Sequence, residues 1–112
     1  MTIVDRKKDI IIRGGENISC LEVDAAIYLH PSVSEAAVFS VPDERLGEVV
    51  GAGVVLRPDQ TLTENDLQDF LRTHLAVFKV PEKIWFRQNL PRGGTEKIDR
   101  RALREDCLNE IS

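Results

Sequence analysis

With 112 residues, of which 42% are hydrophobic and 30% charged, the chain has the size and composition of one folded domain, and two domains would not fit. No apolar run approaches the roughly 20 residues that cross a bilayer, and the start lacks a signal-peptide pattern, so a cytosolic setting is the default expectation. A formal net charge of -4 argues against nucleic acid as a partner.

The charge is divided unevenly along the chain. Residues 14–78 hold three basic and eleven acidic side chains, whereas residues 79–104 hold eight basic and three acidic ones. Residues 1–13 hold four basic and two acidic groups. If the fold brings the two basic stretches together, one face would suit a phosphate-bearing ligand, and solvated surface charge is the alternative explanation.

Residues 3–17 have the pattern of a short two-stranded ribbon. Apolar positions flank a polar stretch, and the segment closes on Gly14 and Gly15. Paired glycines permit positive φ in a turn, or the close approach of another molecule. A turn at these glycines is therefore expected.

Three helices are expected, each beginning at a capping residue. Ser19 opens an S-x-x-E capping box before a helix that runs to about Leu29. Thr63 begins a second box, which is followed at helical spacing by Leu67, Phe70, Leu71 and Leu75. Asp99 can cap a last helix, whose apolar stripe consists of Leu103, Cys107 and Ile111.

Three strands are expected at residues 34–41, 49–56 and 83–87, the first of them ended by Pro42. The second is almost wholly apolar, which suits a central strand covered on both faces, and its glycines Gly51 and Gly53 suggest tight packing beneath a helix. The pattern predicts an α+β domain, with an N-terminal two-stranded β-ribbon and a three-stranded sheet packed with helices.

Cysteine and histidine give no sign of a metal site. Cys20 and Cys107 lie far apart without a CxxC or CxxH neighbour, which favours packing thiols over a disulfide. His30 and His74 stand without a second His, Cys or paired carboxylate at metal-ligand spacing, which favours surface positions at helix ends. No metal ligand is therefore assigned.

The segment 90–101 carries the strongest chemical signal. It is a glycine-bearing loop with one lysine, Lys97, shortly before the last helix. A lysine ammonium is a compact charge on a long stem and can follow a phosphate oxygen through a reaction. Taken alone, however, a lysine in a loop is more often a solvated surface residue.

Two separated motifs resemble the C-terminal domain of the adenylate-forming enzymes, which include acyl-CoA synthetases, adenylation domains and firefly luciferase. The first motif is residues 4–18, Val-Asp-Arg-Lys-Lys-Asp-Ile-Ile-Ile-Arg-Gly-Gly-Glu-Asn-Ile, continuing through Leu21-Glu22-Val23-Asp24. The second is the loop around Lys97. Similar stretches lie between them at His30-Pro31-Ser32-Val33 and at residues 41–48, so the resemblance spans essentially the whole chain.

The resemblance implies a reaction in two steps. Enzymes of this family join a carboxylic acid to ATP, release pyrophosphate, and transfer the acyl group from the adenylate to a thiol such as CoA. It implies that Lys97 bridges the carboxylate and the α-phosphate in the first step, and that Arg6 contacts the ATP ribose. It also implies that Lys8 lies at the hinge position about which the domain rotates between the two steps. Mg²⁺ is expected with ATP, bound mainly outside this domain.

For the second step, the resemblance places the turn with Gly14 and Gly15 along the pantetheine tunnel, where a side chain would narrow the passage. It places Phe78 and Lys79 near the CoA nucleotide, the ring for stacking and the cation for phosphate contact. Phe78 could equally be a core residue. One departure from the family is Glu96, which stands where glycine commonly precedes the lysine and puts an acid beside the cation.

The family keeps its phosphate loop and acyl pocket in a larger N-terminal domain, and neither is found in this sequence. Residues 1–112 are thus expected to be the excised C-terminal lid domain of an acyl-CoA synthetase, of the fatty-acid-CoA ligase kind, inactive by itself. Its expected partners are that N-terminal domain, ATP, a carboxylic acid and CoA. The alternatives are an adenylation domain that loads a carrier protein, and a free-standing module that binds a phosphorylated ligand.

Overall fold

A computed structural model describes residues 10–92 and 98–111 of the chain. These described ranges contain five strands, three α-helices and one short 3-10 helix. In chain order they are β1 (Ile10–Arg13), β2 (Glu16–Ser19), α1 (Cys20–Tyr28), β3 (Val33–Asp43), β4 (Gly47–Leu56), α2 (Glu64–Arg72), η2 (Val77–Lys79), β5 (Lys83–Arg87) and α3 (Arg100–Ile111).

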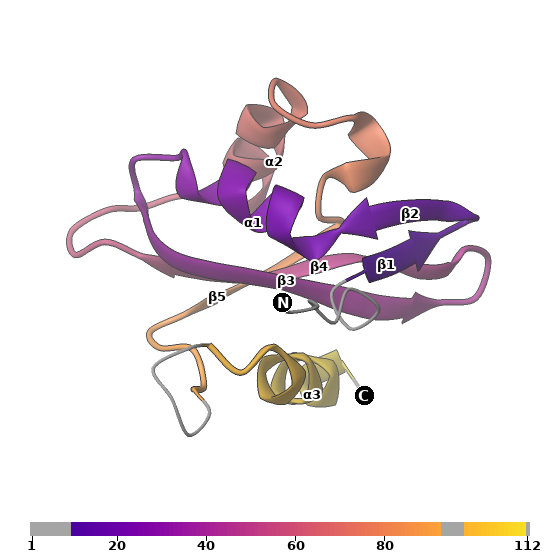
Figure 1. Cartoon of the computed structure of the whole chain (residues 1–112). Coiled ribbons are helices and arrows are strands. Elements are labelled where there is room, and N and C mark those ends of the chain that lie inside the picture. The colour runs from indigo at the N-terminus through magenta and orange to yellow at the C-terminus, as the bar shows by residue number, and fades with distance from the viewer. Residues whose placement is uncertain (1–9, 93–97, 112) are drawn as a thin grey trace, which may run out of the picture.

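The strands form one mixed sheet in the order β2-β1-β4-β3, with β5 paired to β4 as well. β5 runs parallel to β4, and the other pairs are antiparallel. Helices α1 and α2 cover one face, and α3 lies across the other (Figure 1). The predicted α+β class is confirmed, and the ribbon is joined to the three-stranded sheet through one register pair, Arg13 with Gly47.

The ribbon continues two residues past Asn17, where the pattern expected it to end. Its strands flank the glycine turn and end at Ser19, whereas the apolar positions before Ile10 lie outside the described residues. β3 also continues past the proline that was expected to end it, and Pro42 pairs with Glu48. β3 is an edge strand, where proline is tolerated because its missing N–H can face away from the ladder.

The predicted N-cap side chains accept hydrogen bonds from the first turns of the helices. The Ser19 hydroxyl accepts a hydrogen bond from the N–H of Glu22 at 3.4 Å, and the Thr63 hydroxyl accepts one from the N–H of Asp66 at 3.1 Å. Asp99 Oδ1 accepts from the N–H of Ala102 at 3.0 Å at the start of α3. These side chains satisfy backbone donors that the first turn of a helix leaves unpaired.

The hydrophobic core consists of two clusters, one on each face of the sheet. The larger lies under α1 and α2, and its buried members include Cys20, Val38 and Leu67. The smaller lies under α3, where Leu103 and Cys107 are fully buried against Phe39. Both cysteines are buried thiols outside any disulfide, as expected. The side chain of Ile111, the third residue of the predicted stripe, lies outside the described part.

The two glycines of β4 leave space for different neighbours. A Cβ on Gly53 would lie 2.9 Å from the Leu103 side chain of α3, so this glycine does pack beneath a helix. A Cβ on Gly51 would lie 2.5 Å from Val41 Cγ2 and close to the rings of Phe39 and Trp85. Gly51 therefore packs beneath side chains of the sheet itself, contrary to the expectation of a helix at both positions.

Candidate functional site

The glycine turn joins β1 to β2 with two residues between the paired Arg13 and Glu16. Gly14 has φ +57° and Gly15 has φ +92°, which a two-residue hairpin turn of this hand requires at both central positions. A Cβ on Gly14 would lie 3.0 Å from Leu46 Cδ2, whereas a Cβ on Gly15 would meet nothing within 4 Å. The described backbone at Gly15 is thus open to the approach of another molecule.

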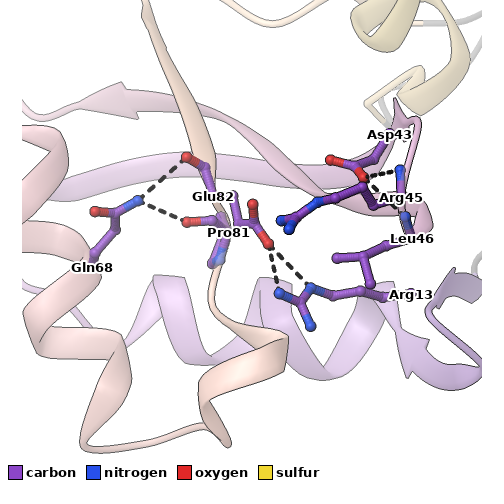
Figure 2. Close-up of polar contacts among 7 residues, drawn as sticks. All are labelled: Arg13, Asp43, Arg45, Leu46, Gln68, Pro81 and Glu82. Carbon is purple, nitrogen blue, oxygen red and sulfur yellow. Dashed lines mark hydrogen bonds and ion pairs between the residues drawn. The ribbon is translucent and has the colours of Figure 1, made fainter.

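The glycine turn rests on a second turn, between β3 and β4. The N–H of Gly14 donates to the carbonyl oxygen of Leu46 at 2.9 Å. Asp43 Oδ1 fixes that second turn by accepting hydrogen bonds from the N–H groups of Arg45 and Leu46 at 2.8 and 2.9 Å (Figure 2). The N–H of Leu46, and then that of Arg45, hold the pKa of Asp43 below its usual range, because both bonds favour the carboxylate.

An ion pair ties the end of β1 to the segment that follows η2. Arg13 donates from Nε and Nη2 to the same carboxylate oxygen of Glu82, at 3.1 and 2.8 Å (Figure 2). Sequence reasoning missed this pair, because the two residues are 69 positions apart and Glu82 belongs to neither of the quoted motifs. It links the glycine turn to the chain that carries Phe78 and Lys79.

Lys79 lies in η2, where it contacts α1. Its Nζ lies 3.0 Å from both carboxylate oxygens of Glu22 and 5.8 Å from the centre of the Phe78 ring. Glu22 was expected to complete a capping box, but its carboxylate contacts this lysine instead. A phosphate approaching Lys79 would have to compete with Glu22 for its charge.

Phe78 is half-buried and packs against the larger core cluster. The ring is therefore partly a core residue, one of the two roles considered for Phe78. Its exposed part remains available for the other role, stacking on a ligand. Val77, beside it, is 75% exposed.

Arg6, Lys8, Glu96 and Lys97 lie outside the described residues. The positions that flank residues 93–97 are well fixed, however. Arg92 and Ile98 form an isolated antiparallel bridge, and the N–H of Asp99 donates to the carbonyl oxygen of Pro91 at 2.8 Å. The described residues on the two sides of positions 93–97 therefore lie next to each other, directly before α3.

Basic residues of α3 gather beside the start of β1. A hollow of about 500 Å³ is lined by Ile10 and, among others, by Arg100, Arg101 and Arg104. Arg100 donates from Nη1 to the carbonyl oxygen of Val38 at 2.7 Å and from Nη2 to Asp24 at 3.0 Å. The second basic stretch therefore lies beside Ile10, in the described part of the first. Arg104 also fastens α3 to the sheet, by donating from Nε to the carbonyl oxygen of Ser40 at 2.8 Å.

His30 and His74 both contact the ring of Phe70, at centroid distances of 4.8 and 4.6 Å. His74 is exposed and His30 is half-buried, so they lie at the protein surface near helix ends. Across residues 10–92 and 98–111, no three His, Cys, Asp or Glu side chains come together in a way that could hold a metal ion. Over the same ranges, none of the helices has the length and apolar character to span a bilayer.

Comparison with known protein families finds one match that covers most of the chain. Residues 22–97 match the AMP-binding enzyme C-terminal domain. Oxalate–CoA ligase of Arabidopsis thaliana is 43% identical over 108 residues, which are 96% of this chain and 21% of that protein. Long-chain-fatty-acid–CoA ligase of Bacillus subtilis is 46% identical over 104 residues, or 93% of this chain and 19% of that protein.

Solved structures give the same result. The Mycobacterium tuberculosis fatty acyl CoA synthetase is similar with a TM-score of 0.82 and 40% identity, over 88% of this chain and 20% of that one. Apo MatB from Rhodopseudomonas palustris has a TM-score of 0.87 and 36% identity, over 94% of this chain and 21% of that one. The chain thus spans about a fifth of the length of the relatives it matches.

Proposed function

The chain belongs to the family of AMP-binding enzyme C-terminal domains, and from that premise we propose that it is the mobile lid of an ATP-dependent acyl-CoA ligase. The ligase as a whole would need a larger N-terminal domain, because the relatives are about five times as long as this chain. That domain is the proposed principal partner of the lid.

The proposed reaction has two steps. A carboxylate oxygen attacks the α-phosphorus of ATP, and pyrophosphate leaves, which gives an acyl-adenylate. The thiol of CoA, losing its proton, then attacks the acyl carbon, and AMP leaves with the electrons of the broken C–O bond. Lys97 would stabilise the charge that develops in the first step, Arg6 would hold the ribose, and rotation about Lys8 would exchange Lys97 for the glycine turn.

The observation that carries this proposal is the geometry of the glycine turn. Gly14 and Gly15 both have positive φ, and no described atom beyond the two chain neighbours of Gly15 lies within 4 Å of the position that a Cβ on Gly15 would take. A narrow thiol-bearing arm could pass over such a backbone, and any side chain at Gly15 would project into its path. Phe78 and Lys79 would then contact the nucleotide end of CoA.

For the acid, we propose a fatty acid. The support is the similarity to a long-chain-fatty-acid–CoA ligase and to a fatty acyl CoA synthetase. Oxalate–CoA ligases are similar to a comparable degree, so oxalate is the competing substrate. Side-by-side turnover of a long-chain fatty acid and of oxalate by the intact enzyme distinguishes them, and faster turnover of oxalate would refute the fatty-acid assignment.

The role of Lys97 is tested by pyrophosphate release from ATP and a carboxylic acid, with the intact enzyme and its Lys97→Ala variant. We expect the variant to lose about 10²–10³-fold in this step, the usual effect of removing one group that stabilises transition-state charge. Transfer from a supplied acyl-adenylate to CoA should change far less. The chain alone should release no pyrophosphate. Equal rates of pyrophosphate release in variant and wild type would refute the assignment.

A further inference from the structure

The segment that follows η2 is held on the sheet by its backbone. The N–H of Glu82 donates to the carbonyl oxygen of Val50 in β4 at 2.9 Å. Gln68 of α2 donates from Nε2 to the carbonyl oxygen of Pro81 at 2.9 Å, as Figure 2 shows. These hydrogen bonds hold the backbone at Glu82 in place, and its carboxylate extends toward Arg13 of the ribbon.

The glycine turn has little to hold it in place by itself. Its two residues have no side chains, and β1 meets β4 at a single register pair, Arg13 with Gly47. The turn is positioned by the bond from Gly14 to Leu46, by the bond from the N–H of Ile12 to Glu48 at 2.9 Å, and by the side chain of Arg13. Arg13 alone among these reaches across to the chain after η2.

The Arg13–Glu82 pair is half-exposed, with 26% and 42% of the two side chains accessible. Ion pairs of this exposure contribute little to overall stability, because water competes for both groups. The pair can nevertheless limit the distance between Arg13 and Glu82, because two N–H groups of one planar guanidinium donate to the same carboxylate oxygen. Its effect would then be on the placement of the turn more than on the stability of the fold.

We infer that Arg13, held by Glu82, is a positioning residue for the thioester-forming step. It keeps the glycine turn at a fixed position relative to Phe78 and Lys79. The thiol-bearing arm of CoA can then pass over the turn while its nucleotide contacts Phe78 and Lys79. This inference rests on the proposed function. Because Lys97 serves the first step from another loop, loss of the pair should leave acyl-adenylate formation intact.

The test uses the intact enzyme and measures the two steps separately. Pyrophosphate release without CoA reports the first step, and single-turnover transfer from preformed acyl-adenylate to CoA reports the second. For Arg13→Gln and for Glu82→Gln, we expect pyrophosphate release within about twofold of wild type and transfer slower by about ten- to hundredfold, the scale on which small misplacements act. The exchanged pair, Arg13→Glu with Glu82→Arg, should recover most of the transfer rate.

Arg45 offers the matched control. Its charge, like that of Arg13, acts on Asp43, but it forms no ion pair with the residues the structure describes. Arg45→Gln removes the same charge and should leave both steps unchanged. Equal slowing of transfer in Arg45→Gln would reduce the effect to general electrostatics and overturn the inference.

Other results are equally decisive. Transfer at the wild-type rate in Arg13→Gln, or equal losses in both steps, would overturn the positioning role while leaving the proposed function intact. If the wild-type enzyme releases no pyrophosphate from ATP and any carboxylic acid, the proposed function itself fails. The two failures are therefore separable.

Discussion

Asp43 accepts two backbone hydrogen bonds in the turn that supports Gly14, and this makes the turn sensitive to pH. The bonds lower the pKa of Asp43 in the folded protein below its ordinary value of 3.8. A lowered folded-state pKa contributes stability that is fully present above the unfolded pKa and is lost as the pH falls through the folded pKa. The charge of Asp43 should thus stabilise the domain at neutral pH and cease to do so in strong acid.

The test compares wild type with Asp43→Asn, which keeps the acceptor oxygen and removes the charge. We expect wild type to have the higher free energy of unfolding at about pH 6, and the difference to shrink toward zero as the pH falls below 3.8 and through the lowered folded-state pKa of Asp43. Urea denaturation at a series of pH values measures it. A difference that stays constant with pH would show that the charge of Asp43 plays no part.

At the scale of single residues, the sequence predicted what is local. Ser19, Thr63 and Asp99 cap the helices as expected, because a cap is a contact between neighbours in the chain. Arg13 and Glu82 could not be paired in advance, since their meeting depends on how β1 and β5 both dock on β4. Arg100 and Asp24 meet across 76 positions for the same kind of reason.

Among the elements, β4 is closely packed at its centre, where Gly51 lies. A methyl group on Gly51 would lie 2.5 Å from Val41 Cγ2, with the rings of Phe39 and Trp85 at 3.1 and 3.2 Å. Aromatic rings and a β-branched side chain have few other rotamers to adopt in a packed core. This strand therefore has no room for a larger residue at that position.

We expect Gly51→Ala to lower the free energy of unfolding by about 1–3 kcal/mol, the usual cost of overpacking a core. The same substitution should cost less in a Val41→Ala background, because the nearest clashing methyl is then gone. Denaturant titration of the two single variants and the double variant measures this coupling. Additive effects would mean that Val41 is not the obstacle.

At this scale the sequence predicted the order and type of the elements, and even the close packing of the β4 glycines. It did not predict which surface each glycine packs against, because Gly53 meets a helix and Gly51 meets the sheet's own side chains. The parallel pairing of β5 with β4 also escaped prediction, since periodicity marks a strand but not its neighbours.

In the whole molecule, the sheet separates two cores that need not open together. Cys20 lies in the larger cluster and Cys107 in the smaller one under α3, and both are buried. Burial raises the pKa of the Cys107 thiol, and the nearby Arg87 opposes this only in part. Cys107 should thus react with an alkylating reagent only when α3 opens.

We expect Cys107 to be alkylated faster than Cys20 below the unfolding midpoint, by on the order of tenfold, which corresponds to about 1.4 kcal/mol in opening free energy. The reason is that the cluster under α3 has fewer buried residues than the cluster under α1 and α2, so opening α3 exposes less apolar surface. Pulsed alkylation of Cys20→Ala and Cys107→Ala, each with one thiol left, measures the two rates. Equal rates would show that both faces open in one cooperative event.

The arrangement of strands around β4 also constrains the path of folding. β3 and β4 are joined by a short turn and begin pairing at Asp43 and Gly47, so little chain entropy opposes their closure. β1 and β5 reach β4 only through contacts between distant parts of the sequence, and such contacts form slowly. We therefore expect the β3–β4 hairpin to form first, and the ribbon that carries the glycine turn to dock on it afterwards.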